Sequence, residues 1–203
     1  MGYVERMSTA LKYEPSLRDL LAAVPEHQTG ELVNGALHVS PRPGPSHAAA
    51  AFNLGVELGP PFERGRGGPG GWRILFEPEL HLGEDVLVPD LAGWRVETLP
   101  TRPTQAHFVT RPDWVCEVLS PSNRRLDRTL KMSVYARHGV EHLWLVDPAD
   151  RTLEVYRRSS GEGMWILLST FIDDDLVTAE PFAAAPFRLG VLWWEDTVEG
   201  AGT

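Results

Sequence analysis

The feature that most constrains the fold is a pair of apolar stretches joined by an amphipathic segment. The first stretch, WVCEVL, begins at residue 114 and ends at Ser-Pro-Ser, which stops a strand. The second, HLWLVDP, begins at residue 142. Between them LDRTLKMSVYARHG (126–139) has the spacing of an amphipathic helix, ended by Gly139. The expected inward positions of this helix are Leu126, Leu130 and Val134. Strand, helix and strand in this order form one crossover unit of an α/β fold.

The remaining segments predict further strands around this unit, in a mixed central sheet. SLRDLLAAVPE (16–26) is typical of a helix capped by Ser16, and Asn34-Gly35 within residues 30–40 predicts a hairpin. A second helix is expected to begin after a cap at Ser46, and RGRGGPGG (64–71) predicts an irregular loop. Strands are expected in WRILFEPELHL, VLVPDLAGWRV, TLEVYRR and MWILLST.

Charged residues stand where the apolar pattern does not predict them. Glu117 interrupts the strand VCEVL, Asp90 follows Pro89 inside the apolar strand VLVPDLAGW, and Lys131 lies on the following helix. An unpaired buried charge costs several kcal/mol, so Glu117 requires a partner. Carboxylates on adjacent strands can bind Mg²⁺ or Mn²⁺ together, while a nearby ammonium orients or deprotonates a water. We therefore expect the carboxylates of Asp90 and Glu117 to lie within reach of one metal ion.

Structural roles are the alternative for each of these residues. Asp90 and Glu117 could instead cap the chain or pair with a buried arginine. Lys131 could be an exposed helix lysine with Asp127 as its i,i+4 partner. Among the weaker candidates, His47 follows the expected helix cap and could contact phosphate, but a surface histidine is the preferred interpretation. Asp147 reads as part of an Asp-Pro turn. Glu77 and Glu79 could add a metal ligand, but solvated residues at a strand edge are the preferred interpretation.

Composition limits the class of protein. The 203 residues suit a single domain (1–203), with flexible ends at 1–14 and 196–203. No apolar run has the length of a membrane span, and no secretory segment is found, so a cytoplasmic protein is expected. The one cysteine, Cys116, reads as a small core residue. A GxSxG motif, a phosphate-binding glycine loop and a Cys/His zinc pattern are all missing from the sequence.

The net charge of −9 opposes nucleic-acid binding, but the charge is unevenly distributed. Between Thr101 and His138, seven arginine or lysine residues face three acidic residues, a local balance of +4. The last 33 residues carry a balance of −6. The basic segment thus surrounds Glu117, either as a substrate-binding surface or as an ordinary solvated face.

Three strings of this sequence resemble the Uma2 family (DUF820) of putative restriction endonucleases. They are GELVNGALHVSPRPGPSH, VPDLAGW and PDWVCEVLSPSNRRLDRTLKMSVYARHGVEHLWLVDP, and the resemblance covers about residues 15 to 195. It implies the PD-(D/E)xK nuclease fold, a restriction-endonuclease-like α/β core with a mixed central sheet flanked by helices. It also implies Mg²⁺- or Mn²⁺-dependent cleavage of DNA.

The resemblance assigns roles to individual residues. Asp90 matches the aspartate of the PD motif, Glu117 the acid of (D/E)xK, and Glu31 a first-motif acid. The expected metal ligands are Asp90, Glu117 and Val118. Leu119 stands where that motif has its lysine, so we expect Lys131 to supply the ammonium from the next helix.

Two functions remain open. One is a metal-dependent endodeoxyribonuclease, and the other is a non-catalytic module that binds nucleic acid or protein. We also expect a homodimer, because an exposed aromatic tail would need a partner. The residues behind this expectation are Phe187, Leu189, Trp193 and Trp194.

Overall fold

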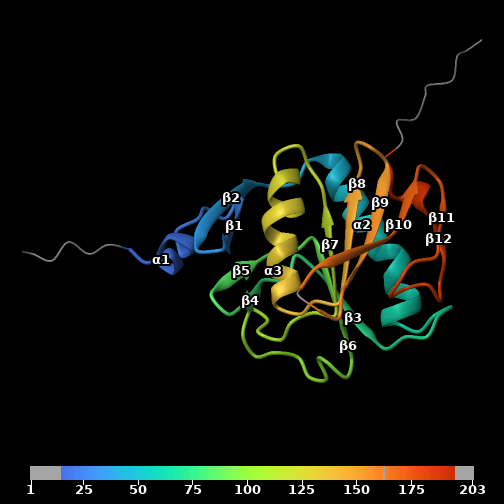
Figure 1. Ribbon diagram of the computed structural model, residues 1–203, viewed down its shortest axis with the longest axis horizontal. Coiled ribbons are helices and arrows are strands. Elements are labelled where there is room, and N and C mark those ends of the chain that lie inside the picture. The colour runs from blue at the N-terminus through green and yellow to red at the C-terminus, as the bar shows by residue number, and fades with distance from the viewer. Residues whose placement is uncertain (1–14, 162, 195–203) are drawn as a thin grey trace, which may run out of the picture.

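A six-stranded mixed sheet forms the centre of the molecule (Figure 1). The computed structural model describes residues 15–161 and 163–194; the two ends predicted to be flexible lie outside these ranges. The strand order is β10-β9-β8-β7-β6-β3, and only β7 and β8 run parallel. The strand bounds are β3 (Trp72–Phe76), β6 (Leu91–Arg95), β7 (Trp114–Val118), β8 (His142–Asp147), β9 (Thr152–Arg158) and β10 (Trp165–Ile172). This is the mixed α/β fold that the sequence predicts.

The predicted crossover between β7 and β8 is present, but its helix differs in register. A π-helical segment, η2 (Leu126–Lys131), leads into α3 (Met132–Arg137). Leu130 is 37% exposed, whereas Asp127 and Lys131 are buried. The predicted inward face was therefore wrong at Leu130, because wider π turns and polar partners inside the molecule turn the charged residues inward.

A smaller antiparallel sheet, in the order β2-β1-β5-β4, extends to one side of the central sheet (Figure 1). Its strands are β1 (Gln28–Val33), β2 (Ala36–Pro41), β4 (Leu80–Leu82) and β5 (Asp85–Leu87). The hairpin between β1 and β2 turns at Asn34 and Gly35, both with positive φ, as an Asn-Gly turn requires. The helix before it, α1 (Leu17–Ala22), begins at Ser16 in a capping box with Asp19.

The second helix begins two residues earlier than the sequence predicts. The helix α2 (Pro45–Leu58) has Gly44 as its N-cap and Pro45 at its first position, so Ser46 is not the cap. A π-helical turn, η1 (Gly59–Glu63), follows, and residues 64–71 form no helix or strand, as predicted. None of the helices in the described ranges is long and apolar enough to cross a membrane.

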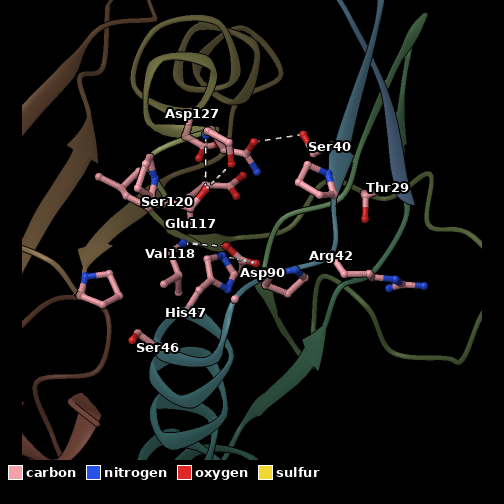
Figure 2. Close-up of a pocket in the computed structure, with 18 of the residues that line it drawn as sticks. Thr29, Ser40, Arg42, Ser46, His47, Asp90, Glu117, Val118, Ser120 and Asp127 are labelled. Atoms are coloured by element: carbon pink, nitrogen blue, oxygen red, sulfur yellow. Dashed lines mark hydrogen bonds and ion pairs between the residues drawn. The ribbon is translucent and has the colours of Figure 1, made fainter. Parts of the chain in front are cut away.

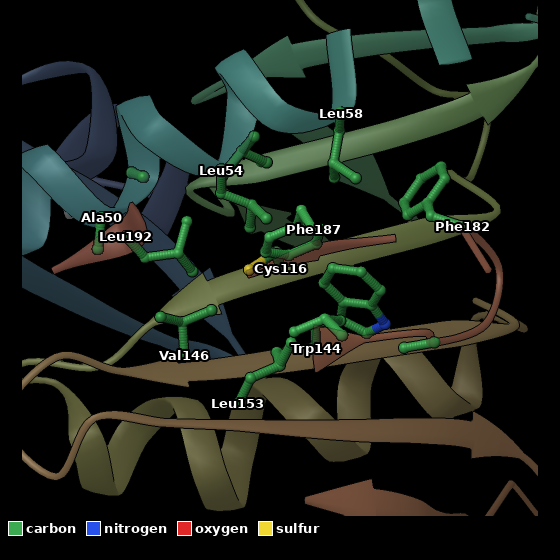
Figure 3. Close-up of a cluster of buried hydrophobic side chains, with 14 of the residues drawn as sticks. Ala50, Leu54, Leu58, Cys116, Trp144, Val146, Leu153, Phe182, Phe187 and Leu192 are labelled. Carbon is green, nitrogen blue, oxygen red and sulfur yellow. The ribbon is translucent and has the colours of Figure 1, made fainter. Parts of the chain in front are cut away.

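Alternation along β7 divides the core between the two faces of the central sheet. Cys116 points toward α2, beside Leu54 and Leu58 (Figure 3). Because side chains alternate along a strand, Trp114 and Val118 share its face and belong to the same apolar cluster. Cys116 is fully buried there, as expected for a small core residue. On the opposite face, Val115 and Leu143 belong to a second cluster with Val134 of α3. Glu117 must point to this second face, toward the helix that carries Lys131.

The aromatic tail folds into the core. After β11 (Leu176–Val177) and β12 (Phe187–Arg188), the last element of the described residues is a 3₁₀ turn, η3 (Leu189–Leu192). Phe182 packs against three tryptophan rings at centroid distances of 4.9 to 5.6 Å, from Trp72, Trp114 and Trp144. Of the four tail residues that suggested a dimer surface, only Trp194 is exposed, at 64%. The expectation of an exposed aromatic surface was therefore wrong for three of these four residues, and the homodimer itself stays a prediction.

Candidate active site

A polar cavity of about 480 Å³ lies where the small sheet, the central sheet and the start of α2 meet. Figure 2 shows Glu117, Asp90 and His47 around it, with α2 beginning below His47 and β2 passing beside Ser40. All five residues proposed from the sequence line this cavity: Glu31, Asp90, Glu117, Val118 and Lys131. The fold thus brings together every predicted site residue, from four separate segments of the chain.

Asp90 and Glu117 are placed by the pairing of β6 with β7. Leu91 pairs with Cys116 in an antiparallel register, so Asp90 lies at the position next to Glu117. The sequence placed Asp90 inside a strand, which was wrong. It lies in the short link from β5 to β6, after Pro89, which has no N–H to donate to a sheet. The link frees the Asp90 side chain to turn toward the cavity.

Lys131 is held at the bottom of the cavity by carboxylates from three elements. Its Nζ lies 2.9 Å from Glu31 Oε1 and 2.9 Å from Glu117 Oε1, with Asp127 Oδ1 at 3.5 Å. The side chain is 3% exposed, so the alternative of an exposed helix lysine was wrong. The ammonium reaches Glu117 as expected, and within the described ranges it forms no ion pair with Asp90.

The charges around Lys131 determine how its ammonium can act. Burial alone would lower the pKa of Lys131, but Glu117 and Glu31 outweigh it and hold that pKa well above its usual value. Burial raises the pKa of Glu117 well above its usual value; Lys131 opposes this shift, while neighbouring carboxylates add to it. These shifts favour a protonated lysine, and they favour uptake of a proton by the crowded carboxylates as the pH falls. Of the two roles expected for Lys131, orienting a water fits this state and deprotonating it does not.

Asp90 is fixed in orientation through both of its oxygens. The backbone N–H of Val118 donates to Oδ2 at 2.7 Å, and His47 Nε2 lies 3.2 Å from Oδ1. His47 is 9% exposed, which contradicts its reading as a surface histidine. Burial tends to lower the pKa of His47, but Asp90 raises it above the usual value, which favours a protonated ring that donates to Asp90.

Two further polar residues of the cluster were not recognised from the sequence as site residues. Tyr135 donates its hydroxyl to Glu117 Oε1 at 2.5 Å, and Asp127 completes the carboxylates around Lys131. A signal was present, because residues 127, 131 and 135 are spaced by four and fall on one side of a helix. His47 was considered only for its position just after the expected helix cap, and its contact with Asp90 was not predicted.

The donor set suits a hard divalent cation. Four carboxylates, from Glu31, Asp90, Glu117 and Asp127, face only one lysine and one histidine, so the cluster carries excess negative charge. Glu117 Oε2 has no hydrogen-bond partner among the described residues. Val118 has an apolar side chain and can contribute only its carbonyl oxygen. Carboxylate and carbonyl oxygens are the ligands that Mg²⁺ and Mn²⁺ prefer.

The other residues considered from the sequence have structural partners. Asp147 accepts from the backbone N–H groups of Ala149 and Asp150, the turn role expected of it. Glu77 lines the cavity and lies 3.6 Å from Arg42. Much of the basic segment is paired with acids, as in Arg124–Asp147 at 2.6 Å, Arg128–Glu154 at 2.7 Å and Arg137–Asp85 at 2.7 Å. Its positive charge is therefore largely neutralised within the fold.

Asp127 gives the metal-free protein a predictable pH dependence. Burial first, and then Glu31 and Asp90 against the opposing Lys131, raise its pKa from 3.8 to about 6. Because this carboxyl pKa is raised, the contribution of Asp127 to stability is full below about pH 4 and is lost as the pH rises toward 6. For a shift of this size the loss is at most about 3 kcal/mol. We expect Asp127→Asn to gain stability over wild type across this range in urea unfolding with EDTA. A variant-to-wild-type difference that is constant from pH 4 to 7 would contradict this.

Comparison with known proteins identifies the family. A solved structure described as a putative nuclease belonging to DUF820, from Anabaena variabilis ATCC 29413, superposes with a TM-score of 0.70. It is 22% identical in sequence, and the match covers 88% of this chain and 97% of that one, so it shows a shared fold. No curated protein matches the sequence. The model of the Uma2 family, described as "Putative restriction endonuclease", matches residues 17–191. With nearly its whole length matched, including every residue of the cavity described above, the chain belongs to the Uma2 family.

Proposed function

We propose that this protein is a Mg²⁺- or Mn²⁺-dependent endonuclease that hydrolyses phosphodiester bonds of DNA, acting in the cytoplasm. The observation that carries the proposal is the buried ammonium of Lys131 between Glu31 and Glu117, beside the fixed carboxylate of Asp90. A buried ion pair with only a structural role needs no open cavity beside it and no second carboxylate held toward that cavity, and this site has both. Such a combination is typical of a site that stabilises developing negative charge.

Asp90, Glu117 and the carbonyl of Val118 would hold the cation. A cation bound there would lower the pKa of a water molecule and offset charge on the phosphate. Lys131 keeps Glu117 and Glu31 in fixed positions and supplies a permanent positive charge beside them. His47 and the Val118 N–H keep both oxygens of Asp90 in place, so the ligands need little rearrangement before reaction.

Donors at the rim of the cavity suit a phosphate backbone. Ser120, Ser122 and Asn123 line it on one side, and Arg42 lines it on the other. Arg42 is about half exposed and only 3.6 Å from Glu77, a weak surface pair that a phosphate can replace. These residues would position the nucleic acid without reading its sequence.

One observation favours the alternative of a non-catalytic binding module. The arginines of the basic segment are largely paired with acids, so the protein offers less free positive charge than the sequence suggested. A module of this kind would bind nucleic acid or protein without cleaving it. Its site residues could be replaced without loss of binding.

Plasmid nicking tests the proposed function. We expect the purified protein to convert supercoiled DNA to open-circular and linear forms with Mn²⁺ or Mg²⁺, and to lose this activity in EDTA. Because contacts to phosphate dominate binding, the rate should fall as salt is raised. Absence of cleavage with either metal, on both plasmid and single-stranded DNA, would favour the binding module.

A further inference from the structure

A second group of metal-binding side chains lies outside the cavity, beside β4. Glu79, His81 and His107 each place one ligand atom within 4.8 Å of the other two. His81 Nε2 is 2.6 Å from Glu79 Oε1, and the rings of His81 and His107 stack at a centroid distance of 3.8 Å. None of the three lines the candidate active site.

Backbone pairing accounts for this convergence. The segment around Phe108 adds to β4 through a parallel bridge with Leu80, in which Phe108 N donates to Glu79 O and His81 N donates to Phe108 O, both at 2.8 Å. Side chains alternate across a strand, so residues on either side of the bridged pair share the opposite face. Leu80 is fully buried and Phe108 packs on Trp94. Glu79, His81 and His107 are therefore directed together to the outer face.

The chemistry of this group differs from that of the cavity. Two imidazoles and one carboxylate are the ligand set of many zinc sites with an open fourth position, whereas the cavity offers oxygen ligands. The nearly parallel rings, 12° apart, must tilt before both can bind one ion, because an imidazole nitrogen binds a metal in the plane of its ring. His107 lies outside the named strands, so a change in its side-chain rotamer would supply this tilt.

We propose that Glu79, His81 and His107 bind a Zn²⁺-type ion that fastens the segment around Phe108 to β4. The ion would replace the direct contact between His81 Nε2 and Glu79 Oε1. The positive charge of Arg18 opposes metal binding, because Arg18 Nη1 lies 3.4 Å from His81 Nδ1. If the metal takes Nδ1, Arg18 competes with it directly. If the metal takes Nε2, the proton moves to Nδ1 and faces a guanidinium.

Metal titration of the tag-free protein tests this site separately from nuclease activity. The probe is Co²⁺, whose visible absorption reports a nitrogen-containing site of low coordination number, with Zn²⁺ displacement and thermal melting alongside. We expect one such ion per chain in the wild type and in an Asp90→Asn/Glu117→Gln variant. His81→Ala and His107→Ala should each weaken binding at least about tenfold, since loss of an outer-shell partner alone costs 10- to 100-fold.

Arg18→Ala provides the sharpest distinction. A metal site predicts tighter Co²⁺ binding in this variant, whereas a group that only makes hydrogen bonds predicts no change. His38→Ala is the matched control, because His38 lies on β2 away from the cluster and should not affect the absorption. Unchanged Co²⁺ binding in His107→Ala, or loss of the absorption in Asp90→Asn/Glu117→Gln, would overturn the proposal. Neither result would bear on cleavage at the cavity.

Discussion

We expect Glu117→Gln and Asp90→Asn to abolish DNA cleavage and to remove stabilisation by metal, while leaving the metal-free protein folded. Both changes reduce negative charge in a cluster with excess carboxylates, and burial already raises the pKa of Glu117. Metal-free stability should therefore be unchanged or higher. In the wild type, Mn²⁺ at 100 times its dissociation constant should add about 2.7 kcal/mol. Cleavage should fall more than about a hundredfold, because even outer-shell changes at metal sites cost 10- to 100-fold.

Thermal melting with and without Mn²⁺, beside plasmid nicking, measures both effects. Glu84→Gln is the matched control, because Glu84 is exposed in the turn between β4 and β5 and does not line the cavity. It should retain cleavage and the Mn²⁺ shift. If the wild type shows no Mn²⁺ shift and both site variants simply unfold, Glu117 and Asp90 are structural residues and the nuclease proposal fails.

Loss of the Lys131 charge should have the largest effect on stability. Lys131→Met leaves Glu31, Glu117 and Asp127 buried without their shared cation. Removal of one partner from a buried ion pair typically costs about 3 to 5 kcal/mol, because the remaining charge is uncompensated. The loss should be smaller at pH 5, where the carboxylates can take up protons, and smaller when Mn²⁺ replaces the missing charge.

Urea unfolding at pH 5 and pH 7.5, with EDTA or Mn²⁺, measures this loss. Arg125→Met is the control, because Arg125 is exposed six residues before Lys131 and should change stability by less than about 0.5 kcal/mol. If Lys131→Met does not fold at pH 7.5, Glu31→Gln in the same chain should restore part of the stability, since it removes one unpaired carboxylate. Equal destabilisation at both pH values would show that packing, and not charge, is what Lys131 contributes.

The local elements could be predicted because short segments carry their own signals. The Asn-Gly hairpin, the capping box at Ser16 and the strands on either side of residues 126–139 follow from turn chemistry and apolar period. Glu117 was also marked by the sequence alone, because a carboxylate within a fully apolar strand requires a partner. The sequence identified Asp90 as a site residue but did not predict that it lies in the link between β5 and β6.

Tertiary structure decided which partner Glu117 has. The spacing of apolar residues predicted that Leu130 faces inward. That pattern depends only on hydrophobic side chains of the helix and takes no account of a carboxylate buried on the strands against which the helix packs. The carboxylates of Glu117, on β7, and Glu31, on the small sheet, turn Lys131 inward instead. His47 was read as a surface residue for the same reason, since its partner Asp90 comes from another part of the chain. A charge in a low-dielectric interior is stable only beside its opposite, and only the packed fold places the two together.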